Sequence, residues 1–94
     1  MLVAYEGRQY MPCADWSRRE GLHRNRAYTL IHAGVVRYVT AQQANMTQYY
    51  IDVECKAPPL IPNVGERNVR YEEIRRSIGH AFVGHLTVLQ AVGV

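Results

Sequence analysis

Several residue types and motifs are scarce in this chain of 94 residues. It has two cysteines, Cys13 and Cys55, which are too far apart for a C-x-x-C pair, so we expect free thiols in a reducing compartment. His80 and His85 are separated by about 140° around a helix, and the other two histidines lie at opposite ends of a predicted helix. Neither spacing suits zinc, so no metal or other cofactor is expected.

Long apolar runs and catalytic motifs are also missing. The most apolar stretch, residues 81–92, contains His85, Thr87 and Gln90 and is shorter than the roughly 20 residues that a membrane span needs. The start of the chain lacks a basic region followed by an apolar run, so we expect no signal peptide and a cytoplasmic protein. There is no glycine-rich phosphate loop, nucleophile motif or catalytic carboxylate pair, which argues against an enzyme.

Lysine is nearly absent, so almost all positive charge comes from arginine. The net charge of +3 and the 48% of hydrophobic residues are typical of one small, mildly basic folded domain. One arginine group is opposed in sequence by Glu20 only and is a candidate for contact with nucleic acid phosphates: Arg18, Arg19, Arg24, Arg26 and Arg37. A second group is interspersed with glutamates, and we expect ordinary solvated charge there: Arg67, Arg70, Arg75 and Arg76.

The first third of the chain predicts two short helices joined by a tight turn. Pro12 suits the first turn of a helix that runs to about residue 20 and stops at Gly21. A second helix is predicted over residues 24–33, with Gly34 as its C-terminal cap. This pattern is typical of a helix-turn-helix, whose second helix enters the major groove of DNA.

Helical spacing divides the second predicted helix into two faces. Ala27, Leu30 and Ile31 cluster on one side, which we expect to face the core. The opposite side would face the bases, with the arginines on its flanks reaching base edges or phosphates. This candidate surface comprises Asn25, Thr29 and His32, with Tyr28 nearby and Arg24 and Arg26 on the flanks.

The middle of the chain predicts a β-hairpin. Residues 35–39 and 49–53 favour strands, and the polar, uncharged residues 40–48 between them are predicted as a loop. A hairpin directly after a recognition helix is a wing. Residues 56–62 contain three prolines and are predicted to be an extended linker, whereas residues 1–9 could be either a strand or a loose arm.

The last third predicts a helix with an apolar stripe, although Gly79 and Gly84 each cost about 1 kcal/mol relative to alanine in a helix. The stripe comprises Ile74, Ile78, Ala81, Phe82, His85, Leu89 and Val92. Such a helix must be buried, either on its own chain or against another one, and the sequence favours neither. The other chain would belong to a homodimer or tandem assembly, or to a different protein that docks on this helix. The assembly would use Ile74, Ile78, Phe82, Leu86 and Leu89, and His85 is expected to be a hydrogen-bonded core or interface residue.

The stretches YMPCADWS at 10–17, RREGL at 18–22 and LIHAG at 30–34 resemble small winged helix-turn-helix proteins of the phage excisionase and MerR-like group. The resemblance covers about residues 8–58 and implies an α+β fold with two short helices and a hairpin wing, followed by a C-terminal helical extension at 63–94. It implies double-stranded DNA as partner, and an integrase for the excisionases, which bind in tandem and bend DNA. The DNA-binding residues would be Arg18, Arg19, His23, Arg24, Asn25, Arg26, Tyr28, Thr29, His32 and Arg37.

Three features depart from the family pattern. His23 replaces the usual serine or threonine cap; a lost cap costs about 1 kcal/mol, so we expect a looser or shifted helix start, or capping by Asn25. Residues 40–48 carry no lysine or arginine, so a wing there gains little from the negative potential of the minor groove. Residues 63–94 have no counterpart in the minimal family.

Two functions therefore stay open. The first is a sequence-specific DNA-binding protein of a phage or mobile element, either an excisionase-type recombination directionality factor or a small transcription regulator. The second is a phage-type protein-interaction or inhibitor module that keeps the winged-helix fold and does not depend on DNA.

Overall fold

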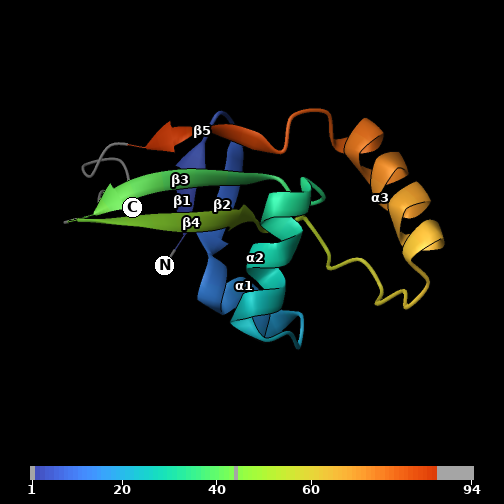
Figure 1. The fold of residues 1–94 in the computed structure, drawn as a ribbon. Helices are drawn as coiled ribbons and strands as arrows, with labels where there is room; N and C mark the ends of the chain where they lie inside the picture. Colours follow the sequence, from blue (N-terminus) through green and yellow to red (C-terminus); the bar gives the residue numbers. More distant parts are fainter. Residues whose placement is uncertain (1, 44, 87–94) are drawn as a thin grey trace.

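The protein is an α+β structure in which helices accompany a single curled sheet (Figure 1). The computed structural model describes residues 2–43 and 45–86. The elements are β1 (Val3–Tyr5), β2 (Arg8–Pro12), α1 (Cys13–Arg19), α2 (Arg24–Ala33), β3 (Tyr38–Gln43), β4 (Met46–Asp52), α3 (Val64–Ile78) and β5 (Phe82–Leu86). The strand order is β1-β2-β4-β3-β5, and only the β3–β5 pair is parallel. The predicted α+β class is confirmed.

The two N-terminal helices form where the sequence predicts them. Pro12 immediately precedes α1, and Gly34 closes α2 in the left-handed conformation with φ of 74°. The predicted inner face of α2 is buried, and the indole of Trp16 on α1 donates a hydrogen bond to the carbonyl of Cys55 at 3.0 Å. Local signals were sufficient here because caps and apolar spacing both act within a few residues.

The expectation of a lost cap at the start of α2 is wrong. His23 precedes the helix, and its Nδ1 accepts a hydrogen bond from the backbone N–H of Asn25 at 3.1 Å. An imidazole nitrogen thus satisfies one of the free N–H groups that a serine or threonine oxygen usually satisfies. Asn25 is not the cap but lies inside α2, where its carbonyl accepts from the hydroxyl of Thr29 at 3.0 Å. The helix begins at Arg24, without the expected shift.

Residues 3–9 belong to the sheet or to the turn between its first two strands. β1 and β2 pair as an antiparallel hairpin whose turn residues Glu6 and Gly7 both have positive φ, 49° and 81°. Positive φ at both positions matches the tight turns whose twist suits a two-strand hairpin. Of the two alternatives for this segment, the strand is therefore the one that forms, and β2 then pairs with β4.

The predicted central hairpin is confirmed, but its strands are longer and its loop shorter than expected. β3 and β4 pair continuously from Tyr38 opposite Ile51 to Gln43 opposite Met46. Most of the predicted 40–48 loop is therefore strand. Its threonine and glutamine side chains do not prevent pairing, because alternate positions of a strand can face solvent while the others are buried.

The prediction of a single C-terminal helix is wrong. α3 ends at Ile78, and Gly79 adopts a φ of 80° that breaks the helix. The chain then reverses into β5, whose backbone pairs with the edge of β3. The expected interface stripe is consequently split: Ile74 and Ile78 lie on α3, Phe82 and Leu86 lie on β5, and Leu89 and Val92 lie outside the described residues.

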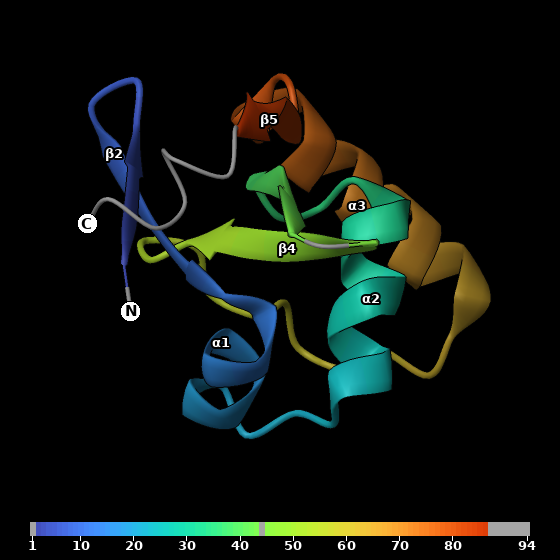
Figure 2. The ribbon, with the colours of Figure 1, turned by 90° about the vertical axis from the view of Figure 1, so that its left-hand side faces the viewer.

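Figure 2 shows the curl of the sheet, with α1 and α2 beside it. The sheet carries a separate apolar cluster on each face. One cluster packs α1 and α2 against the sheet and contains Cys13, Trp16, Ala27, Leu30, Ile31, Val35, Val36, Ile51 and Tyr71. The other lies on the opposite face and contains Val3, Tyr10, Val39, Ala41, Tyr50 and Leu86. Curling brings the edge strands together, because the ring of Tyr5 on β1 fills the space where a Cβ at Gly84 on β5 would lie.

Candidate nucleic-acid interface

The predicted outward face of α2 is open to solvent. Arg24, Asn25, Thr29 and His32 are all exposed, while Tyr28 beside them is half-buried. The structure therefore brings together the residues that helical spacing nominates for contact with bases. The opposite side of α2 packs into the core through Ala27, Leu30 and Ile31, and this packing holds the exposed residues in place.

The surface around this face carries no acidic side chain among the described residues of α2, β3 and β5. The sequence between Gly21 and Ile51 contains no aspartate or glutamate, and neither does the β5 segment. This absence of acidic residues can be read from the sequence, but the prediction of the interface relied on the arginine cluster instead. An acid-free surface avoids repulsion from phosphates, so a few cations are enough to give it a positive potential.

A row of aromatic rings connects α2 with the edge of the sheet. The ring centroids of Tyr28 and Tyr49 are 5.7 Å apart, those of Tyr49 and Tyr38 are 6.0 Å apart, and those of Tyr38 and Phe82 are 5.5 Å apart. Burial raises the pKa of the Tyr38 hydroxyl, so it stays a neutral donor at physiological pH. Of this row, the sequence predicts only Tyr28 as a DNA contact and Phe82 as part of an assembly interface. The row itself was not predicted, because Tyr49, Tyr38 and Phe82 come from three different strands.

His85 does not occupy the buried position that was expected for it. It lies exposed on β5, and its Nδ1 is 2.8 Å from the hydroxyl of Thr40 on β3. The expectation assumed a helical stripe that does not form. Thr40 and His85 add polar atoms to the surface along the sheet.

Arg19 is used to hold the fold together. Its guanidinium donates to the carbonyls of Val53 and Cys55 at 2.7 and 2.8 Å and bonds to the carboxylate of Glu20 at 3.0 Å. Glu20 in turn accepts from the backbone N–H of Ala57 at 2.7 Å. These bonds tie the end of α1 to the segment that leaves the sheet.

Arg37, another of the predicted DNA-binding arginines, is bonded to two distant parts of the fold. It donates to Asp52 at 3.2 Å and to the carbonyl of Ile78, the last residue of α3, at 3.0 Å. The Asp52 side chain is 1% exposed and also pairs with Arg8 at 3.3 Å. An arginine in such a cluster stabilises the fold and offers few free donors to an outside ligand.

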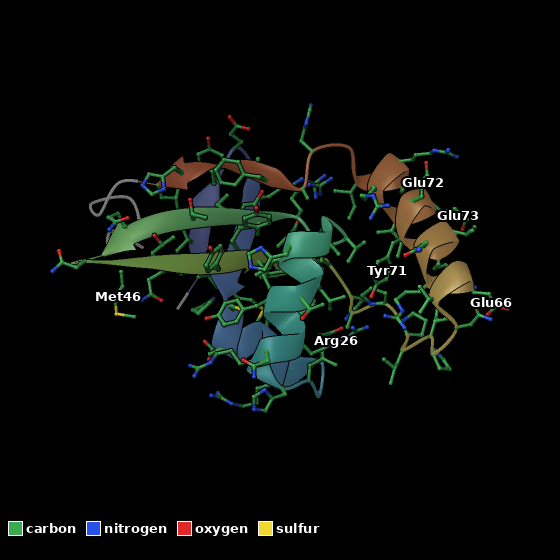
Figure 3. All side chains as sticks on the ribbon, in the orientation of Figure 1. Arg26, Met46, Glu66, Tyr71, Glu72 and Glu73 are labelled. Carbon is green, nitrogen blue, oxygen red and sulfur yellow. The ribbon has the colours of Figure 1, made fainter. Side chains whose placement is uncertain are left out.

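Arg26 points away from the open face of α2 and toward α3 (Figure 3). Its guanidinium donates to the hydroxyl of Tyr71 on α3 at 3.1 Å. The two flanks of α2 are therefore not equivalent, since one is occupied by α3 and the other leads to the tyrosine row.

Arg18 and Arg24 are the members of the arginine group that reach solvent freely. The side chain of Arg18 is 79% exposed, and its contact with Asp15 at 3.4 Å is a surface pair of small energetic value. Arg24 is exposed at the first turn of α2. The five arginines that are close in sequence thus do not form one continuous basic patch.

The described residues contain no group of three histidine, cysteine or acidic side chains that could hold a metal ion. Burial raises the pKa of both thiols, Cys13 and Cys55, so at neutral pH they are protonated and poor nucleophiles. In the same part of the chain, none of the helices combines the length and apolar character that crossing a bilayer requires.

Comparisons of this chain with protein-family models, curated proteins and solved structures find no match. The resemblance to winged helix-turn-helix proteins rests on the residues quoted above and stays a prediction.

Proposed function

We propose that this protein binds double-stranded DNA by placing the outward face of α2 in the major groove. The observation that carries the proposal is the combination of an exposed polar face on α2 with the absence of acidic residues from the described parts of α2, β3 and β5. A solvated helix face needs no such gap in acidic residues, whereas a surface that approaches phosphates does.

The residues of α2 have different roles in this proposal. Asn25, Thr29 and His32 face the base edges, where amide, hydroxyl and imidazole groups discriminate between base pairs. Arg24 reaches a base edge or a phosphate at the start of the helix. Arg18 and the hydroxyl of Tyr28 contact the backbone, which positions the helix without reading sequence.

The β3–β4 hairpin acts as the wing, which makes the whole unit a winged helix-turn-helix. It follows α2 directly in the chain, and its outer part carries glutamine, threonine and asparagine. These side chains can hydrogen-bond to sugar and phosphate oxygens, but they add no counterion release. Within this class, the resemblance favours an excisionase-type factor, with an integrase as partner, or a small transcription regulator.

A titration against a mixed-sequence duplex at two salt concentrations tests the proposal. We expect binding that weakens with salt, and a loss of about tenfold or more in affinity for Arg24→Ala, equivalent to one charged contact. Arg76→Ala is the matched control, because this arginine is also exposed but lies on α3, and its affinity should equal that of the wild type. Absence of binding at low salt, or equal effects of the two variants, would contradict the proposal.

A further inference from the structure

α3 is the least buried element of the fold. Of its 15 residues, only Tyr71 is buried, and the helix is held to the body mainly by arginine hydrogen bonds. Val69 faces away from the body and is 62% exposed. A helix that buries so little against its own chain gains stability when its free side is covered.

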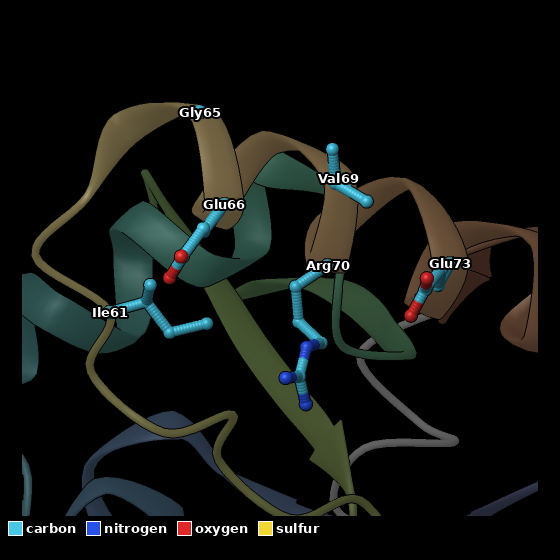
Figure 4. A pocket seen from close by; sticks show the side chains of 6 residues that line it. All are labelled: Ile61, Gly65, Glu66, Val69, Arg70 and Glu73. Atoms are coloured by element: carbon cyan, nitrogen blue, oxygen red, sulfur yellow. The ribbon is translucent and has the colours of Figure 1, made fainter.

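The free side of α3 contains a hollow of about 560 Å³ (Figure 4). Ile61 from the preceding linker and Val69 supply its apolar walls, and Gly65 leaves room between them because it has no side chain. Glu66, Arg70 and Glu73 complete the lining. These three charged groups form no ion pair with one another or with other described residues, unlike Arg76, which pairs with Glu72 at 3.2 Å.

We propose that this hollow receives α3 of a second copy of the chain, with the two helices crossing in antiparallel directions. A two-fold interface must be complementary to itself, so it needs both charge signs on one surface. The free side of α3 meets this requirement with Arg70 between two glutamates. A uniformly acidic or basic partner would leave one sign opposed by like charge.

The crossing is defined by apolar and charged contacts together. Val69 of each copy enters the hollow above Gly65 and Ile61 of the other. This register brings Glu66 of each copy beside Arg70 of the other, and symmetry produces the pair twice. Antiparallel helices also oppose their dipoles favourably. The contact does not involve the outward face of α2, so the dimer does not rest on the DNA-binding proposal.

Sedimentation equilibrium of the full chain measures the association directly. We expect a concentration-dependent shift from the 10.8 kDa monomer to twice that mass. Val69→Asp should abolish the shift. Val64→Asp is the matched control, since Val64 is 61% exposed on the same helix but does not line the hollow, and it should dimerise normally.

Charge reversal tests the register. Glu66→Arg and Arg70→Glu should each weaken dimerisation by about tenfold or more, because each single change places like charges together twice. The double variant should restore the wild-type dissociation constant. A chain that stays monomeric at millimolar concentration, equal behaviour of Val69→Asp and Val64→Asp, or a double variant no better than the singles would overturn the proposal. Circular dichroism of each variant checks that it remains folded.

Discussion

Arg24 and Arg37 are close in sequence and of one residue type, yet the structure uses them in opposite ways. Arg24 extends from the first turn of α2 into solvent, whereas Arg37 is 20% exposed and bridges the buried carboxylate of Asp52 to the end of α3. Arg19 and Arg26 resemble Arg37, since both bond to distant parts of the chain. A cluster of arginines in sequence is therefore not evidence of a basic surface.

Because most of these arginines are bonded within the fold, the charge of the candidate interface depends on the other residues around α2. Three of the five arginines are bonded within the fold. The candidate interface therefore depends on the absence of acidic residues from α2, β3 and β5 and on polar side chains such as Asn25 and Tyr28. If Arg19, Arg26 and Arg37 are structural, then Arg18 and Arg24 alone of the five supply charge to DNA.

The largest effect is expected at the buried carboxylate. Asp52→Ala removes the buried carboxylate that pairs with Arg37 and leaves Arg37 only the carbonyl of Ile78; breaking a buried pair costs about 3–5 kcal/mol of unfolding free energy. Glu54→Ala is the control, because Glu54 is 78% exposed and pairs with the same Arg8 at 3.3 Å, so its effect should be under about 0.5 kcal/mol. Urea unfolding measures both. Similar losses for the two variants would mean that the Asp52 cluster does not anchor the fold.

The salt dependence of DNA binding counts the arginines that reach phosphates. Each neutralised phosphate contributes about −0.9 to the slope of log affinity against log salt, so Arg18 and Arg24 together predict a slope of about −2. Contact by all five arginines would give about −4.5. A slope near the larger value would show that the internal bonds of Arg19, Arg26 and Arg37 open on binding. Fluorescence anisotropy with a labelled duplex provides the measurement.

The bond between Arg26 and Tyr71 should have a moderate effect on stability and none on DNA affinity. Tyr71→Phe removes the hydroxyl but keeps the buried ring, so we expect a loss of about 1 kcal/mol in unfolding free energy. Since the open face of α2 is untouched, the duplex affinity should equal that of the wild type. A selective change in affinity would instead indicate that the α3 flank of α2 takes part in binding.

The smallest effect concerns Glu20, the partner of Arg19. The hydrogen bond from the backbone N–H of Ala57, aided by Arg19, holds the pKa of the Glu20 carboxyl below its usual value of 4.5. Its stabilising contribution is therefore complete above that value and is lost as the pH falls through the lower folded-state pKa. As the pH is lowered below 4.5, the midpoint temperature of thermal unfolding should fall more steeply for the wild type than for Glu20→Gln. Identical pH profiles would mean that this bond contributes no pH dependence.

The sequence predicts α1 and α2 well because their signals are local. Pro12 and Gly34 mark helix ends within a turn of the residues they affect, and the spacing of Ala27, Leu30 and Ile31 identifies the buried face. The prediction of one continuous C-terminal helix failed because the interactions that decide the conformation there are not local. Its apolar residues fit a helical period, but Gly79 and pairing with β3, more than forty residues earlier, decide the conformation.

The candidate site was predictable in part. Helical spacing identified Asn25, Thr29 and His32 as one exposed face, and the structure retains it. Helical spacing could not reveal that Arg37 pairs with Asp52, since this bond depends on how β3 and β4 align. The aromatic row was hidden for the same reason. The lack of acidic residues between Gly21 and Ile51 is visible in the sequence and predicts the candidate interface better than the arginine cluster does.

Mapping of duplex DNA onto the protein by amide chemical-shift perturbation tests the central claim most directly. We predict that the largest shifts on adding duplex occur at Arg24, Asn25, Thr29 and His32, with smaller shifts in β3–β4 and none on the free side of α3. Largest shifts on another surface, or no change along α2, would contradict the account.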